Sequence, residues 1–243
     1  MNVALIFAGG RGVRMQAGSV PKQFLEIYGR PVIVHTLEAF QEHPDIDAIL
    51  VVILDEFKDE LMRLIDRYEL DKVKWIVPGG ATGQESRHLG LRALAEHCPP
   101  ETTVLIHDGV RPLVDEELIS ANLRSVAEYG SGVTCTKTNE TVVRVDGDTI
   151  EDVIPREPLW TAQAPQSFPL GAALEVYERA AREGMTDSID TCFLFRHYGI
   201  PVRMVPGPHT NIKVTTSSDF YVARTFFTLI EDEKAFGAKA GAE

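Results

Sequence analysis

The sequence predicts an α/β protein with a doubly wound, mostly parallel β-sheet and a protruding β-hairpin arm. Short runs of β-branched and apolar residues alternate with amphipathic stretches at helical spacing over most of the chain, as in successive β-α-β units. Ala48–Leu54 is apolar throughout, which is typical of a strand buried on both faces of a parallel sheet. We therefore expect a Rossmann-like sheet that binds ligands at the carboxyl ends of its strands.

The same periodicity assigns the individual elements within one expected domain, residues 1–243. The predicted sheet strands are Val3–Phe7, Ala48–Leu54, Val73–Val77, Val104–His107, Val202–Val205 and Ile212–Thr215. The predicted helices are Val32–Gln41, Phe57–Tyr68, Ser86–His97, Glu116–Tyr129, Pro169–Glu183, Asp190–Tyr198 and Ser218–Glu231. The tail Lys234–Glu243, rich in Ala, Gly and Lys, is expected to fray.

A break in the alternation predicts the arm. Thr141–Val145 and Thr149–Ile154 have the pattern of two strands joined by the tight turn Asp146-Gly147. A two-stranded ribbon alone is marginal in water, so we expect the arm, residues 139–156, to pack on the body or on a second subunit. A homodimer is the expectation that follows.

Composition excludes several classes of protein. Apolar residues make up 44% of the chain and charged residues 25%, as in ordinary globular proteins. No apolar run approaches the roughly 18–20 residues of a membrane span. The net charge of −12 argues against sequence-independent nucleic-acid binding, which needs a basic face. The three cysteines contain no CxxC pair, and Met1–Phe7 is expected to be a strand rather than a signal peptide, so we expect a cytoplasmic protein.

A glycine-rich segment, Ala8-Gly9-Gly10-Arg11-Gly12-Val13-Arg14-Met15, follows the first predicted strand. Glycines there let the backbone approach a ligand and present N–H groups to phosphate oxygens. The segment lacks the Gly-Lys-Ser/Thr ending of a P-loop, and Met15 stands where a dinucleotide site has Gly or Ala. Pro21-Lys22-Gln23-Phe24 follows, so Arg14 and Lys22 can bracket a triphosphate. A plain glycine-rich turn is the alternative.

Further candidates lie later in the chain. Asp108 and Arg111 end a predicted strand, at the edge of the sheet where ligands bind. Asp108 is a candidate ligand for Mg²⁺ that bridges phosphates, and alternatively a cap of the next helix. Lys213 follows a short strand and can reach a phosphate there, or is a surface lysine. The sequence contains no HExxH pattern, which would indicate a metalloprotease, and no Gly-x-Ser-x-Gly pattern, which would indicate a hydrolase triad.

Four ordered blocks of the chain resemble the sugar-phosphate cytidylyltransferases, which include ribitol-5-phosphate and 2-C-methyl-D-erythritol 4-phosphate enzymes. The blocks are Ala8–Met15 with Pro21–Phe24, Ile106–Pro112, Ala164–Phe168 and Asn211–Thr215. The resemblance runs over nearly the whole chain. It implies transfer of CMP from CTP to a polyol phosphate, with Mg²⁺ as the cofactor and pyrophosphate as the second product.

The resemblance also implies roles for individual residues. Arg14 and Lys22 match residues that stabilise charge on the α-phosphate, while Arg156 and Lys213 match residues that hold the acceptor phosphate. Arg156 follows the arm, so it is expected to serve the site of the other subunit, or else is a surface residue. The implied substrate-binding residues are Phe7, Ala8, Gly9, Gly10, Gly80, Ala81, Ser86, Asp108, Arg111 and Thr141.

The segment Gly79–Ser86 resembles the loop that reads the cytosine edge, and Ser86 as a helix N-cap is the local alternative. The segment departs from the family pattern, because residues 81–83 are Ala, Thr and Gly where acidic or basic side chains are common. The details of cytosine recognition therefore do not carry over.

Two blocks bear on the acceptor. Gln166-Ser167-Phe168 is similar to the ribitol-5-phosphate enzymes, and Thr210 stands where the methylerythritol enzymes usually carry an aspartate that contacts the acceptor hydroxyls. Ribitol 5-phosphate, a precursor in teichoic acid biosynthesis, is therefore the favoured acceptor, and methylerythritol phosphate of isoprenoid biosynthesis is the alternative.

A non-catalytic nucleotide-binding regulator is the alternative to an enzyme. Such a protein would have lost one or more of the cations that the family uses. All five cations are present: Arg14, Lys22, Arg111, Arg156 and Lys213.

Overall fold

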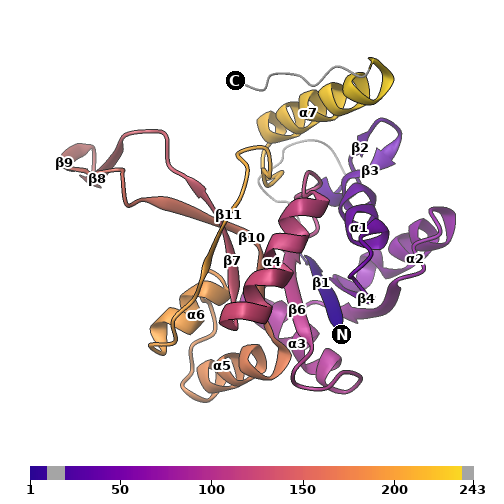
Figure 1. The fold of residues 1–243 in the computed structure, drawn as a ribbon, viewed down its shortest axis with the longest axis horizontal. Helices are drawn as coiled ribbons and strands as arrows, with labels where there is room; N and C mark the ends of the chain where they lie inside the picture. Colours follow the sequence, from indigo (N-terminus) through magenta and orange to yellow (C-terminus); the bar gives the residue numbers. More distant parts are fainter. Residues whose placement is uncertain (10–19, 237–243) are drawn as a thin grey trace.

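The computed structural model describes residues 1–9 and 20–236. At its centre lies a seven-stranded sheet with the order β11-β7-β10-β6-β1-β4-β5 (Figure 1). Its strands are β1 (Asn2–Ala8), β4 (Ala48–Ile53), β5 (Val73–Pro78), β6 (Thr103–Asp108), β7 (Gly132–Lys137), β10 (Trp160–Pro169) and β11 (Met204–Pro206). Neighbouring strands are parallel except at β10, which runs antiparallel to both β6 and β7.

Helices cover both faces of this sheet. They are α1 (Val32–Glu42), α2 (Lys58–Arg67), α3 (Gly83–Ala95), α4 (Glu116–Tyr129), α5 (Leu170–Arg182) and α6 (Thr191–His197), while a further helix, α7 (Ser217–Phe236), lies apart from them. Successive strand residues point to opposite faces, so Val3 and Leu5 of β1 enter one core with α3, α5 and α6, while Ala4 and Ile6 enter the other with α1, α2 and α4. The predicted doubly wound, mostly parallel sheet is confirmed.

Helix α7 packs outside these two layers. Phe220, Ala223 and Phe227 form a third apolar cluster with residues from the hairpin β2 (Glu26–Ile27) and β3 (Arg30–Pro31) and from the loop after β6. Thr216 and Asp219 begin the helix by capping each other's backbone N–H groups, at 3.2 and 2.7 Å. Within the described residues, no helix is both long and apolar enough to cross a membrane.

The register of the sheet brings several loops to one edge. Phe7 pairs with Asp108, and the Gly109 N–H donates to the Phe7 carbonyl at 2.9 Å. On the other side of β1, Ala8 pairs with Ile53, whose carbonyl accepts from the Gly79 N–H at 2.8 Å. The segments that follow β1, β5 and β6 therefore leave the sheet next to one another.

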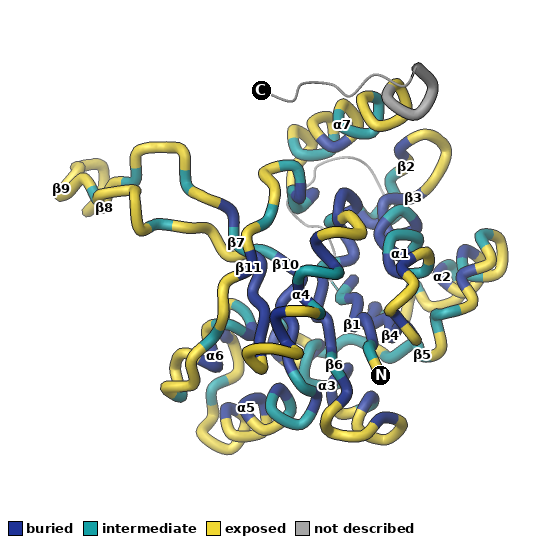
Figure 2. Tube along the Cα trace, viewed as in Figure 1, coloured by how far each residue is buried: buried dark blue, intermediate teal, exposed yellow. Residues whose placement is uncertain are grey.

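The arm is a hairpin of β8 (Val142–Asp146) and β9 (Thr149–Ile154), as predicted. Gly147 closes its turn with a φ of +57°, a conformation that glycine adopts without strain. The hairpin projects from the body, and most of its trace is exposed (Figures 1 and 2). Its exposed apolar side chains are Val143, Val145, Ile150 and Val153.

Several predicted elements need correction. β7 and β10 are sheet strands that the sequence did not predict, and the strand expected at Val202–Val205 lies at Met204–Pro206. The strand expected at Ile212–Thr215 is absent, because Val214 and Ile212 donate to Val110 and Thr210 instead of to a neighbouring strand. The tail prediction is wrong up to Phe236, where α7 continues, and otherwise falls outside the described residues.

Candidate active site

A pocket of about 200 Å³ opens where β1 and β6 end. This strand-tip pocket takes its walls from β1, α3, β6, β10, the loop before α6 and the segment after β11. Its side chains include Phe7, Arg87, Asp108, Arg111, Gln163, Gln166, Ile189, Asp190 and Lys213. Segments far apart in the sequence thus meet at the carboxyl ends of the strands, where α/β sheets of this kind bind their ligands.

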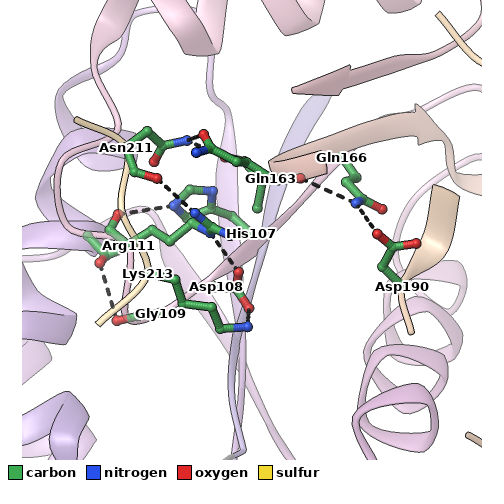
Figure 3. A network of polar contacts seen from close by, with 11 residues as sticks. His107, Asp108, Gly109, Arg111, Gln163, Gln166, Asp190, Asn211 and Lys213 are labelled. Atoms are coloured by element: carbon green, nitrogen blue, oxygen red, sulfur yellow. Dashed lines mark hydrogen bonds and ion pairs between the residues drawn. The ribbon is translucent and has the colours of Figure 1, made fainter. Parts of the chain in front are cut away.

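Asp108 holds two cations in this pocket (Figure 3). Its Oδ1 accepts from Lys213 Nζ at 2.6 Å, and its Oδ2 accepts from Arg111 Nε at 2.9 Å. Burial works to raise the pKa of Asp108, but Lys213 and Arg111 together hold that pKa far below its ordinary value. The carboxylate is therefore ionised, and the three side chains carry a net positive charge beside the open pocket.

Asn211 fixes the backbone that carries Lys213. Its Nδ2 donates to the Ala164 carbonyl at 2.7 Å and to Gln163 Oε1 at 3.1 Å, both on β10. Its carbonyl accepts from Arg111 Nη1 at 2.8 Å. This fully buried residue therefore joins β10, the loop after β6 and the segment that leads to Lys213.

His107 supports the pocket from below. Its side chain is buried, and its Nε2–H donates to the Arg111 carbonyl at 3.2 Å, since a carbonyl can only accept. Desolvation lowers the pKa of His107 to about 4, so the imidazole is neutral at physiological pH. Buried and hydrogen-bonded in this way, it acts as a structural support rather than as a general base.

A second hollow of about 490 Å³ adjoins the pocket, and Phe7 lines both. This glycine hollow is lined by Phe7, Gly9, Leu54, Gly80, Ala81, Thr82, Gly83 and Ser86. Ser86 Oγ accepts from the Gly80 N–H at 3.0 Å and donates to the Thr82 carbonyl at 2.9 Å, which folds the loop back on itself. A side chain at Gly80 would meet the Glu85 side chain, which folds over the loop and accepts from the Ala81 N–H at 2.6 Å.

Both helix-cap alternatives are wrong. Thr82 caps α3, with its Oγ1 accepting from the Glu85 N–H at 3.1 Å, so Ser86 lies inside the first turn. Asp115 caps α4 by accepting from the Leu118 N–H at 2.8 Å. Asp108 and Ser86 therefore do not cap these helices; Asp108 lines the strand-tip pocket, and Ser86 lines the glycine hollow.

The structure brings together most of the described residues that the sequence predicted for the site. Phe7, Gly9, Gly80, Ala81 and Ser86 line the glycine hollow, and Asp108, Arg111 and Lys213 line the strand-tip pocket. Ala8 is the buried last residue of β1.

The remaining predicted residues lie elsewhere. Lys22 begins the short 3₁₀ helix η1 (Lys22–Phe24), half-buried and lining neither cavity. Arg156 and Thr141 lie at the base of the exposed arm, where Arg156 Nη1 donates to the Asn139 carbonyl at 2.7 Å. Gly10 and Arg14 fall outside the described residues.

Sequence reasoning missed several polar contributors to the pocket, among them Gln166, Asp190 and Arg87. Gln166 Nε2 donates to Asp190 Oδ2 at 2.8 Å, and Asp190 Oδ1 caps α6 through the Phe193 N–H. Arg87 enters from α3, one residue after Ser86. Gln166 was visible in the Ala164–Phe168 block, whereas the contacts of Arg87 and Asp190 reach residues too distant in sequence for local patterns to reveal.

Residues 2–229 match the family described as IspD, 2-C-methyl-D-erythritol 4-phosphate cytidylyltransferase. The chain belongs to this cytidylyltransferase family. Two relatives of different names illustrate its range. A ribitol-5-phosphate cytidylyltransferase of Vibrio parahaemolyticus is 45% identical over 238 residues, covering 98% of this chain and 100% of the relative. A 2-C-methyl-D-erythritol 4-phosphate cytidylyltransferase of Syntrophus aciditrophicus is 38% identical, covering 92% of this chain and 94% of the relative.

The fold of this cytidylyltransferase family member also matches solved structures. The crystal structure of 4-diphosphocytidyl-2C-methyl-D-erythritol synthase from Anaerococcus prevotii superposes with a TM-score of 0.79 at 28% identity. The superposition covers 93% of this chain and 96% of the Anaerococcus prevotii chain. The predicted family resemblance is confirmed over the same span that carries both cavities.

Asn211→Ala tests the support of the pocket. The change leaves the Ala164 carbonyl without its buried donor, so we expect the free energy of unfolding to fall by about 1–3 kcal/mol. Denaturant unfolding measures this loss. A stability within about 0.5 kcal/mol of wild type, as for an ordinary surface change, would contradict the assigned role.

Proposed function

We propose that the protein transfers CMP from CTP to a polyol phosphate, with ribitol 5-phosphate as the favoured acceptor, and releases pyrophosphate. The observation that carries this proposal is the net positive strand-tip pocket beside a glycine-lined hollow, within a chain that is 45% identical to a ribitol-5-phosphate cytidylyltransferase. The chain as a whole is acidic, with a net charge of −12. The two cations held by Asp108 therefore create a local positive charge that can bind an anion.

In this proposal the two cavities divide the substrates. The glycine hollow receives the nucleoside of CTP, where backbone groups and Ser86 face the base. Arg14 and Lys22 stabilise charge on the α-phosphate, and Lys213 holds the acceptor phosphate in the strand-tip pocket. The shared wall at Phe7 sets the two ligands side by side, as a transfer between them requires.

The chemistry is an in-line displacement. An oxygen of the acceptor phosphate attacks the α-phosphorus of CTP, the bond from that phosphorus to the β-phosphate oxygen breaks, and pyrophosphate leaves. The acceptor phosphate is already ionised near neutral pH, so no general base is needed. The main barrier is repulsion between anions, which positioned cations reduce.

Magnesium fits the site as an ion that arrives with the CTP phosphates. Asp108 offers ionised hard oxygens, although each already accepts a bond from a cation. In the part of the chain that the structure describes, no group of three His, Cys, Asp or Glu side chains is arranged to hold a metal. We propose Asp108 as a single protein ligand of Mg²⁺, which would offset charge on the phosphates.

The arm supports a homodimer in which Arg156 and Thr141 serve the partner's site. Neither residue lines the strand-tip pocket or the glycine hollow of its own chain, and the arm exposes a row of apolar side chains. A hairpin of this kind is stable when a second surface covers it. We place the enzyme in the cytoplasm, where its activated ribitol product would enter teichoic acid biosynthesis.

Gel filtration with light scattering tests this assembly. Because the arm of one chain would pack on its partner, we expect a mass twice the 26.9 kDa of the chain. Val145→Asp, which places a charge on the exposed apolar row, should shift the protein toward monomer. A monomeric wild-type protein with full activity would contradict the dimer.

A panel of acceptors tests the substrate. With CTP and Mg²⁺, we expect kcat/KM for ribitol 5-phosphate to exceed that for 2-C-methyl-D-erythritol 4-phosphate by at least about tenfold, as for a pocket that reads hydroxyl groups. Release of pyrophosphate measures each reaction. Preference for the methylerythritol acceptor would establish the alternative, and silence with every acceptor would contradict the proposed function.

Lys22→Ala tests the assigned cation. If Lys22 stabilises charge that develops on the α-phosphate, kcat should fall by about 100-fold or more while the fold survives. Lys58→Ala, which removes an exposed lysine at the start of α2, is the matched control and should keep wild-type turnover. Near wild-type turnover in Lys22→Ala would remove that residue from the mechanism.

A further inference from the structure

The segment 184–190, between α5 and α6, forms one wall of the strand-tip pocket through Ile189 and Asp190. Met185 packs against the core at the start of the segment, but the Ile189 side chain is 82% exposed, so apolar packing does little to hold the part that faces the pocket. Its position must therefore come from polar contacts to its backbone and to Asp190.

Most of those contacts come from the loop and helix that carry the glycine hollow. Thr82 Oγ1 donates to the Thr186 carbonyl at 2.9 Å. Gln84 donates from Nε2 to the Met185 carbonyl at 2.5 Å and accepts at Oε1 from the Ser188 N–H at 2.6 Å. The side chains of residues 82 and 84 thus hold the first half of the segment.

Arg87 holds the second half, the part that faces the pocket. Its Nη2 donates to the carbonyls of Ser188 and Ile189 at 3.3 and 3.4 Å, and its Nε donates to Tyr177 Oη at 2.9 Å. The guanidinium carbon lies 5.8 Å from the centre of the Phe7 ring, at the wall that both cavities share. Arg87 is therefore the point where the wall, the shared partition and helix α3 meet.

Only a planar, forked donor can make these contacts together. Tyr177 is fully buried in the core between the sheet and α5, so its hydroxyl is a fixed anchor. With Nε bound to that anchor, the rigid guanidinium aims Nη2 at two consecutive carbonyls of the wall. A lysine ammonium would place one point charge there and would not reproduce the geometry.

We propose that Arg87 is a positioning residue for the acceptor. It fixes the wall Ser188–Asp190 opposite Lys213, and it ties that wall to the helix turn that carries Ser86 of the glycine hollow. The acceptor is thereby held in a constant position relative to the nucleotide. This inference rests on the proposed function, and it adds a residue outside the four family blocks.

Kinetics of Arg87→Met and Arg87→Lys test this role. We expect the KM for ribitol 5-phosphate to rise by about tenfold or more in both variants, since a bond to a charged donor shifts an equilibrium by about that factor. The KM for CTP should stay within about twofold of wild type. Arg92→Met, the same change at an exposed site on the same helix, should behave as wild type.

Two results would overturn the proposal. Unchanged acceptor KM in both variants would show that Arg87 does not position the acceptor. Equal rises in both KM values would show a general structural or nucleotide-binding role instead. If Arg87→Met does not fold, Arg87→Lys decides, because it keeps the charge and loses only the fork.

Hydrogen–deuterium exchange separates this inference from the proposed function. In the protein without substrate, amides of residues 184–190 should exchange faster in Arg87→Met than in wild type or Arg92→Met. Equal exchange in all three would overturn the anchoring itself. A wild-type protein that transfers CMP to no acceptor, yet shows the expected exchange, would refute the proposed function and leave the anchoring role of Arg87 standing.

Discussion

The site depends on one partly buried carboxylate between two cations. Removing Asp108 would leave Arg111 and Lys213 as two neighbouring like charges without compensation, which is strongly unfavourable. Asp108 therefore fixes the positions of Arg111 and Lys213, which come from different segments of the chain. The excess positive charge faces the pocket, where an anionic ligand would balance it. The arrangement has an obvious use in an enzyme that must bring two phosphates together.

The sheet provides the conditions for this cluster. Parallel pairing of β1 with β6 sets Phe7 opposite Asp108, and the backbone bond from Gly109 to Phe7 holds the end of β6 in place. The reversed strand β10 then passes beside β6 and offers the Ala164 carbonyl to Asn211. A protein of net charge −12 can offer a local positive charge here because the fold brings Arg111 and Lys213 together at this edge.

Sequence reasoning succeeded where a residue's environment is set locally. β4 was predictable because all its residues are buried, and the arm because its Asp-Gly turn has a known backbone requirement. It failed where distant partners decide. β10 contains Pro165 and Pro169, which argue against a strand, yet it pairs on both sides and has an irregular register between Ala162 and Gln166.

The same limit applies to the site. The glycines, Asp108 and Lys213 belong to recognisable blocks, so their types and order were enough to predict that they would lie near one another at the edge of the sheet. Thr82 rather than Ser86 caps α3, because the choice depends on where the loop turns and not on residue type. Arg87 was invisible from the sequence, since its partners Ser188 and Ile189 lie about a hundred positions away.

The central claim is that Asp108, Arg111 and Lys213 form a preset site for the acceptor phosphate next to the nucleotide. A crystal structure with CTP, Mg²⁺ and an unreactive phosphonate analogue of ribitol 5-phosphate tests this most directly. The account predicts the phosphonate on Lys213 Nζ, with one oxygen in line with the α-phosphorus of a CTP whose base lies in the glycine hollow. A phosphonate bound away from Lys213, or a nucleotide outside that hollow, would contradict it.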